Sequence, residues 1–205
     1  FTADLITPMR LYAGSNCLYG HACRIVLKEK DVDCDVLDPA ADPEFDLTEL
    51  NPYGESPTLI DRELVLYGDN VITEFLDERL PHPPLMPLDP IGRGRARLLV
   101  ARLQRDWLNE VKRLLDEGKP LNKKLKKSLW DGLLAMSPIF LAQRYAMGNE
   151  FSLVDCYLAP LLWRLSAMDV TLPRQGQAVM DYSERLFERS TFQASLNSLE
   201  RDMNT

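Results

Sequence analysis

The chain has few of the side chains that build metal centres and disulfide frameworks, with two histidines and four cysteines among 205 residues. The cysteines are Cys17, Cys23, Cys34 and Cys156. No two of them form a CxxC pair, and none has a metal-ligand spacing with His21 or His82. A chain of this length does not need disulfides to fold. The sequence therefore predicts reduced thiols, no metal site and no cofactor.

Long apolar segments and a secretion signal are also absent from the sequence. No run reaches eighteen apolar residues, which excludes a membrane-spanning helix. The first residues, FTADLITPMRLY, lack the basic start, apolar core and small-residue cleavage site of a signal peptide. The composition, 45% hydrophobic and 27% charged, is that of an ordinary globular chain. We therefore expect a soluble, cytoplasmic protein.

Positive charge is scarce in the first part of the chain. Residues 1–80 carry six Lys and Arg against seventeen Asp and Glu, a net charge of −11, whereas residues 81–205 carry 18 and 14, a net charge of +4. A protein of net charge −7 repels the phosphates of nucleic acid, so direct nucleic-acid binding is not expected as the main function. A protein partner fits this charge better.

Residues 8–80 alternate short apolar runs with helical patterns, which is typical of a small α/β domain. Helices are predicted at 18–30 and 69–80, with a short one near 45–50. We expect Ser15 or Asn16 to cap the first helix and Asp69 the last. The predicted strands are 9–13, 33–38, 58–60 and 64–67.

Residues 89–205 show helical periodicity without a further strand pattern, which predicts an all-α second domain. Its tryptophans lie on apolar faces, where core packing is the expected role. Ser152 and Asp155 form an S-x-x-D capping box before a very apolar helix, so Asp155 is expected to serve structure rather than catalysis. The predicted helices are 91–118, 122–136, 151–165, 177–190 and 191–203.

Five prolines lie between Leu80 and Pro90, in the stretch LPHPPLMPLDP. Proline stiffens a linker and resists helix, so residues 81–88 are predicted to join the two domains rigidly. A stiff linker needs no histidine, however, and an exposed proline surface loses little entropy when a partner docks on it. Both interpretations of this stretch stay open from the residues alone.

The order of these elements, with Ser56-Pro57 opening a strand and a proline-rich link before a helical half, resembles the glutathione transferase superfamily over about residues 9–203. The resemblance implies a thioredoxin-like first domain, in which Pro57 is the cis-proline, and an all-helical second domain. The fold class is therefore expected to be α/β plus all-α, glutathione transferase-like.

Four strings are more specific: RIVLKEK, LNPYGESPTLIDREL, FLDERLPHPPLMP and FSLVDCYLAPLLWRL. They resemble the stringent starvation protein A family, which is associated with bacterial RNA polymerase. That resemblance implies a homodimeric, non-enzymatic regulator of transcription in the stress response. Its implied partners are RNA polymerase holoenzyme with its sigma factor, and other transcription factors. Carried onto this chain, the implied partner-binding residues are Leu80, Pro81, His82, Pro83 and Pro84.

Thiol chemistry at Cys17 is the alternative function. The stretch CLYGHACR aligns with the CPFxxxxR pattern of thiol-dependent transferases, which puts Cys17 at the nucleophile position beside a helix N-terminus. No second cysteine lies three residues on to resolve a mixed disulfide. His21, one helical turn further, is expected to cap the helix or face solvent.

The glutathione site supplies a second argument against that alternative. Enzymes of the superfamily place an acidic residue and then Ser or Thr at the start of the third helix, where they receive the γ-glutamyl carboxylate of glutathione. This chain has Gly68 and Asp69 at those positions. A carboxylate there repels the ligand, by about 1 kcal/mol in water and about 4 kcal/mol at an effective dielectric of 20. We therefore expect a degenerate glutathione site, unless Asn70 supplies the missing donor.

Two basic stretches remain. One is the arginine series from Arg93 to Arg105, and the other is the lysine cluster from Lys119 to Lys127. Leucines interrupt the lysines at helical spacing and no aromatic group lies among them, which favours a solvated helix face over a nucleic-acid site.

Overall fold

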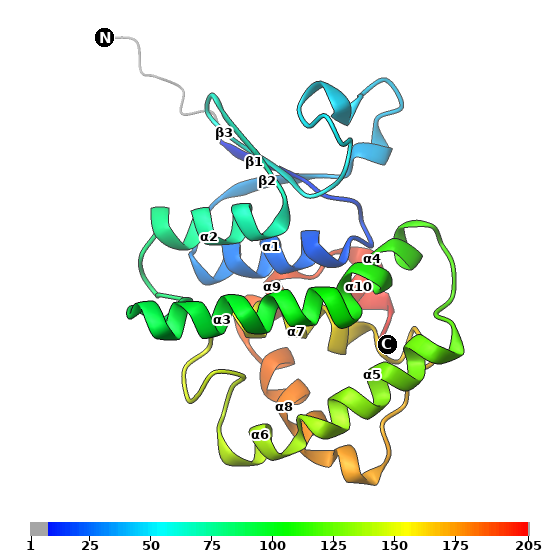
Figure 1. The fold of residues 1–205 in the computed structure, drawn as a ribbon. Helices are drawn as coiled ribbons and strands as arrows, with labels where there is room; N and C mark the ends of the chain where they lie inside the picture. The colour runs from blue at the N-terminus through cyan, green and yellow to red at the C-terminus, as the bar shows by residue number, and fades with distance from the viewer. Residues whose placement is uncertain (1–7, 205) are drawn as a thin grey trace.

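A four-stranded sheet begins the computed structural model, which describes residues 8–204 (Figure 1). Its strand order is β2-β1-β3-β4, with β1 parallel to β2 and antiparallel to β3, and β3 antiparallel to β4. The parallel pair requires a crossover, which α1 (Leu18–Glu29) provides. The strands are β1 (Met9–Tyr12), β2 (Cys34–Leu37), β3 (Thr58–Asp61) and β4 (Leu64–Tyr67).

One face of the sheet packs on helices α1 and α2 (Asp69–Arg79), as Figure 1 shows. Leu11 and Leu59 point into this layer and are fully buried. On the opposite face Tyr12 stacks on Phe45, with ring centroids 4.7 Å apart. The segment between β2 and β3 holds only two short 3₁₀ turns, Pro39–Ala41 and Leu47–Glu49. The predicted thioredoxin-like arrangement of the first domain is confirmed.

The helix caps differ from the predicted ones. The N-cap of α1 is Cys17, whose sulfur accepts the Gly20 N–H at 3.3 Å, and not Ser15 or Asn16. The N-cap of α2 is Gly68, with φ at 86° and no side-chain cap, and Asp69 is the first residue of the helix. The cap prediction failed because the side chains of Asn16 and Asp69 are bound by distant residues, Arg164 and Tyr157.

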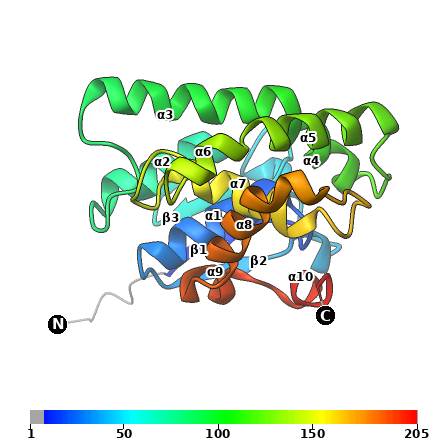
Figure 2. The same cartoon turned by 90° about the horizontal axis from the view of Figure 1, so that it is seen from below.

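The second half is helical throughout the described residues, and Figure 2 shows its α3 on the opposite side of α1 and α7 from α9 and α10. The predicted helix 91–118 is present as α3, a π-helical stretch at Gln104–Leu108, and α4. The helices are α3 (Pro90–Leu103), α4 (Asn109–Asp116), α5 (Lys123–Ala135), α6 (Ser137–Ala142), α7 (Leu153–Arg164), α8 (Gln177–Phe187), α9 (Ser190–Ser195) and α10 (Ser198–Asp202).

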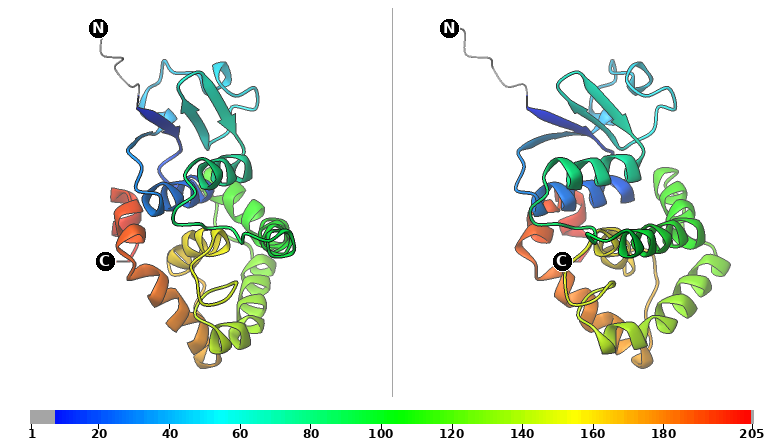
Figure 3. Two further views of the ribbon diagram at one scale, coloured as in Figure 1. Left: turned by 90° about the vertical axis from the view of Figure 1, so that its left-hand side faces the viewer. Right: turned by 60° about the vertical axis from the view of Figure 1, so that its left-hand side comes forward.

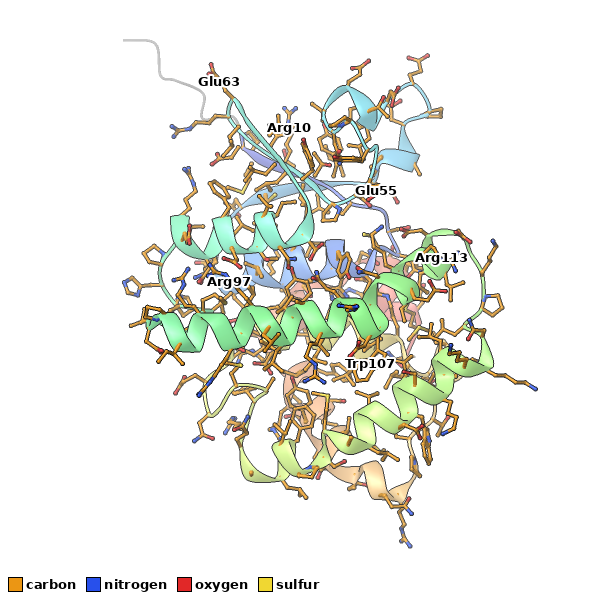
Figure 4. All side chains as sticks on the ribbon, in the orientation of Figure 1. Arg10, Glu55, Glu63, Arg97, Trp107 and Arg113 are labelled. Atoms are coloured by element: carbon orange, nitrogen blue, oxygen red, sulfur yellow. The ribbon has the colours of Figure 1, made fainter. Side chains whose placement is uncertain are left out.

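Trp107 lies in the π-helical stretch and closes the contact with α5 (Figure 4). Its indole N–H donates to Ser128 at 3.2 Å, and its ring lies over Gly132. A Cβ atom at Gly132 would come within 2.1 Å of that ring, so only glycine fits there. Trp107 has the predicted core role, whereas the prediction for Trp130 was wrong, because 38% of its surface is exposed.

Helix α7 is buried nearly all round and forms the centre of the helical half. Asp155 accepts the backbone N–H of Ser152 at 2.8 Å and its hydroxyl at 3.0 Å. It also accepts the Ala146 N–H at 2.9 Å and the Tyr182 hydroxyl at 2.5 Å. Burial raises the pKa of Asp155, which these hydrogen bonds oppose. Asp155 therefore joins the start of α7 to a loop and to α8.

The last segment of the chain packs on α1 of the first domain. The predicted helix 191–203 breaks into α9 and α10, because Asn197 caps α10 and accepts the Glu200 N–H at 2.9 Å. Glu200 is fully buried between Arg24 and Arg164. His21 lies beside them and is also fully buried, so the expectation that it caps α1 or faces solvent was wrong. Burial and the two guanidinium groups hold the pKa of His21 well below 6.5.

Candidate functional sites: the cysteine cleft and the linker face

The thiol of Cys17 is closed off from solvent. Its side chain is 1% exposed, and its sulfur accepts the Gly20 N–H and lies 3.8 Å from the Ser56 carbonyl oxygen. The peptide bond between Ser56 and Pro57 is cis, and the Ser56 carbonyl faces the start of α1. A nucleophile must reach its substrate, and in this arrangement the Cys17 thiol is buried.

A cleft lies beside the buried thiol, between the loop before β3 and α4. It has a volume of about 430 Å³ and is lined by Glu55 and Ser56 on one side and by α4 on the other. Figure 4 labels Glu55 on the loop before β3 and Arg113 on α4, and both residues line this cleft. Arg113 pairs with Glu110 and Glu117, and Lys112 with Asp116, within α4 itself. The cleft cations are thus neutralised by their own helix.

Asp69 is the residue that the sequence predicts at the place where enzymes of the superfamily receive the γ-glutamyl carboxylate. Its carboxylate accepts the Tyr157 hydroxyl at 2.8 Å and the Gln104 amide at 2.5 Å. Burial raises the pKa of Asp69, and the bonds from Tyr157 and Gln104 oppose that rise. Asn70 donates its amide to Gln104 at 3.1 Å and so is not a spare donor. Intramolecular bonds therefore fill the polar part of this position and join α2 to α7 and to the π-helical stretch that follows α3.

Replacing Asp69 by serine is expected to raise the affinity for glutathione. Removal of a repulsion of roughly 1 kcal/mol corresponds to about fivefold. The measurement is retention on glutathione-agarose, with Asp106→Ser as the control, because Asp106 is an exposed aspartate of the π-helical stretch Gln104–Leu108. Unchanged retention of Asp69→Ser would show that the aspartate does not exclude the ligand.

The linker face is the second candidate site. The prolines and histidine from Pro81 to Pro84 are exposed, and Leu80 is half-buried. The backbone beneath them is fixed: Lys30 donates to the Pro83 carbonyl at 2.5 Å and pairs with Asp77 at 2.7 Å. Asp77 in turn accepts the Leu85 N–H at 2.8 Å. On the other side the Leu85 carbonyl accepts the Leu153 N–H of α7 at 2.8 Å. Both halves of the molecule therefore hold this segment in place.

A groove of about 600 Å³ runs beside the exposed linker residues. One wall is Pro83, Pro84 and Leu85, and the other is the loop from Arg144 to Phe151. Figure 3 shows the linker and this loop on the same face of the molecule. Arg189 forms part of the groove: its guanidinium lies 3.9 Å from the Phe151 ring centroid and pairs with Glu29 at 2.8 Å.

The groove could not be found from the sequence. The loop 144–151 lies nearly sixty residues after the linker, and Arg189 lies about forty residues after that loop. No motif connects the three. Only the flanking exposed prolines gave a local signal.

Two arginines of α3 join the two halves of the molecule. Arg97, labelled in Figure 4, pairs with Glu74 of α2. Arg93 pairs with Glu78 of the same helix.

Residues 8–204 offer no cluster of three or more His, Cys, Asp or Glu side chains that could hold a metal ion. Within the same residues, every helix is too short or too polar to cross a membrane.

Comparisons with known proteins agree with the fold. The family model described as the glutathione S-transferase N-terminal domain matches residues 7–78, and that of the C-terminal domain matches residues 106–190. A crystal structure of a glutathione S-transferase from Methylobacillus flagellatus with glutathione bound is 25% identical, with a TM-score of 0.77 over 91% of this chain and 98% of that one.

Two curated relatives are more similar in sequence. The stringent starvation protein A homolog of Pasteurella multocida is 46% identical over 192 residues, which is 92% of this chain and 90% of the relative. The homolog of Coxiella burnetii is 43% identical over 198 residues, 95% of this chain and 94% of the relative.

Proposed function

The chain belongs to the stringent starvation protein A family, built on the two domains of glutathione S-transferases, and we propose that it regulates transcription by binding RNA polymerase holoenzyme through its linker face. The observation that carries this proposal is the exposed segment Pro81–Pro84, held rigidly from both sides and flanked by a groove. A docking surface that is ordered before binding loses little conformational entropy when its partner arrives.

The linker face also has the chemistry of a protein-binding surface. Prolines and the rings of Tyr145 and Phe151 offer apolar area, while Arg144, Asn149 and Glu150 supply polar groups at the edge of the groove. Arginine and aromatic side chains are enriched where proteins bind each other. His82 stands among the prolines as an exposed hydrogen-bonding group. In the proposed complex, sigma factor and polymerase are the partners of this face.

The same proposal assigns no glutathione transferase activity to the chain. It is supported by the buried Cys17 thiol and by Asp69, whose carboxylate holds donors that a ligand carboxylate would need. The alternative, a glutathione- or thiol-dependent transferase using Cys17, requires that the start of α1 move and free the thiol.

We further propose a cytoplasmic homodimer with domains at 8–80 and 89–205 and a linker at 81–88. Exposed apolar side chains support a contact between subunits: Tyr53 is 74% exposed, and Val71 and Leu98 are more than half exposed. They lie on the loop before β3, on α2 and on α3. Opposite charge on the two parts of the chain, −11 and +4, favours pairing of the first domain with the helical domain of a second copy.

The test of the proposed function is a pair of retention measurements on one preparation. Immobilised protein is expected to retain purified RNA polymerase holoenzyme, and the same protein is expected to pass through glutathione-agarose. Glutathione conjugation or thiol-transfer turnover that disappears in Cys17→Ser, together with no retention of holoenzyme, would establish the alternative instead. In this variant the serine hydroxyl oxygen replaces the Cys17 sulfur as the acceptor of the Gly20 N–H, so the start of α1 is kept.

A further inference from the structure

A pocket of about 280 Å³ lies at the β2 edge of the sheet, away from the linker face. Its walls are β2, the side of α1 and the segment 194–197 that joins α9 to α10. Its lining residues include Arg24, Leu27, Lys28, Val32, Cys34 and Val36.

The pocket exists because the apolar layer beneath the sheet is incompletely covered at β2. Pairing of β1 with β2 places Cys34 beside Met9 and Val36 beside Leu11, so all four side chains share the face that packs on α1. Leu11 is fully buried, whereas 45% of the Val36 surface is exposed. The pocket is thus an opening into the apolar layer, large compared with the roughly 150 Å³ that hold a benzene molecule in an apolar cavity.

The charged groups of the pocket are all positive. Lys28 and Arg24 line it, and no Asp or Glu is among its described lining residues. This is unusual within residues 1–80, where acids outnumber bases by seventeen to six. Lys28 is exposed and has no acidic partner within 4 Å among residues 8–204, so its charge is available to a ligand.

A second positive charge lies behind the pocket wall. Arg24 and Arg164 both bind the one carboxylate of Glu200, each at 2.6 Å. His21, which contacts Arg164 at 2.9 Å, is neutral because its pKa is held well below 6.5 by burial and by both arginines. Two guanidinium groups against one carboxylate leave this buried cluster with an excess positive charge, and buried charge is poorly screened by salt.

We infer that this pocket binds a small organic anion, a monocarboxylate with an apolar body of roughly benzene size. The apolar body contacts Leu27, Val32 and Val36, and the carboxylate lies at the rim beside Lys28. The excess positive charge at Arg24 adds to the attraction. This site is separate from the linker face and from the Cys17 cleft, so it does not depend on the proposed function.

The test uses 4-fluorobenzoate as the probe and ligand-observed ¹⁹F NMR as the measurement. Full-length protein is expected to bind it with a dissociation constant of about 1 mM or below, as the ten heavy atoms of the probe allow. The neutral isostere 4-fluorobenzamide is expected to bind at least about fivefold more weakly, because it lacks the charge. Equal binding of the two probes would contradict the role of Lys28 and Arg24.

Two variants locate the binding. Lys28→Met is expected to weaken 4-fluorobenzoate binding about threefold to fivefold, whereas Lys124→Met, an exposed lysine on α5, should leave it unchanged. Ala194→Phe should abolish binding, because Ala194 is exposed and a phenyl group there fills the pocket without entering the core. Binding that survives both Lys28→Met and Ala194→Phe would place the probe elsewhere and overturn the inference.

Cys34 gives an independent readout that needs no variant. It is the one half-exposed cysteine among the four, since Cys17, Cys23 and Cys156 are buried. Burial and Asp35 raise the pKa of Cys34 to about 12, so its alkylation by iodoacetamide is slow and is followed by mass spectrometry at raised pH. Saturating 4-fluorobenzoate is expected to slow the modification of Cys34 severalfold. An unchanged rate would contradict binding in this pocket.

Discussion

Replacing Glu200 by glutamine is expected to lower the free energy of unfolding by about 3–5 kcal/mol, because removing one partner of a buried ion pair leaves the other charges without compensation. Glu200 is fully buried, and its two oxygens accept hydrogen bonds from Arg24 at 2.6 and 2.8 Å. One of them also accepts from Arg164 at 2.6 Å, and the other from the Asn197 N–H at 3.0 Å. Glutamine has one acceptor oxygen and an NH₂ group with two donor hydrogens, so its NH₂ group must face a guanidinium or a backbone N–H.

The effect of this substitution should depend on pH. Burial opposes ionisation of Glu200, but the bonds and charges of Arg24 and Arg164 hold its pKa below 4.5. A carboxylate whose pKa is lower in the folded than in the unfolded state stabilises the fold at pH values above the unfolded-state pKa. This stabilisation is lost as the pH falls through the folded-state pKa. The difference between wild type and Glu200→Gln should therefore be largest at neutral pH and shrink below about pH 4.5.

Urea denaturation at a fixed protomer concentration measures this difference, and Glu184→Gln is the control because Glu184 is an exposed glutamate on α8. A decrease of less than about 1 kcal/mol in the free energy of unfolding at neutral pH would contradict this prediction. It would mean that other groups compensate the charges of Arg24 and Arg164.

Much of the fold follows from short-range patterns in the sequence. The spacing of apolar residues in α1, α2 and α7 shows which face of each helix is buried, and this spacing can be read from a few helical turns. Such patterns do not predict the position of a side chain whose partners are distant in the sequence. His21 looked like a solvent-facing residue because nothing local shows Ser195 and Arg164 beside it. The burial of Glu200 against α1 likewise depends on a contact across more than 170 residues.

The candidate sites also differ in whether local sequence patterns reveal them. The exposed prolines, Cys17 and Asp69 were visible in the sequence because each lies at a recognisable local position. The groove beside the linker was not, since Arg189 and the loop 144–151 reach it only through the packing of α8 and α7. The role of Asp69 also differs from the predicted one: the sequence predicted a helix cap, and the carboxylate accepts hydrogen bonds from Tyr157 and Gln104.

The second large effect concerns the linker face. Replacing Pro81, His82 and Pro83 together by alanine is expected to lower retention of RNA polymerase holoenzyme at least about tenfold, because residues at the centre of an interface cost more than 1–2 kcal/mol each when truncated. All three side chains are exposed, and the Pro83 carbonyl that binds Lys30 belongs to the backbone, so the fold should be kept. Circular dichroism and sizing check the fold and the oligomeric state.

A single substitution separates docking from stiffness. His82→Ala leaves every proline of the linker in place, so a linker that only stiffens the joint would retain holoenzyme fully in this variant. We expect a loss of severalfold, because an exposed hydrogen-bonding group at the interface is removed. The triple variant has a control of its own, the double variant Pro43→Ala with Pro173→Ala. It shows the general effect of losing two prolines, since both lie outside the linker.

The central claim is that the function resides at the linker face and not at the Cys17 cleft. The measurement that tests it most directly compares holoenzyme retention by two variants, the Pro81-His82-Pro83 triple alanine variant and Cys17→Ser. The account predicts that the triple variant loses retention while Cys17→Ser keeps the wild-type level. Retention that is unchanged in the folded triple variant, or lost in folded Cys17→Ser, would contradict it.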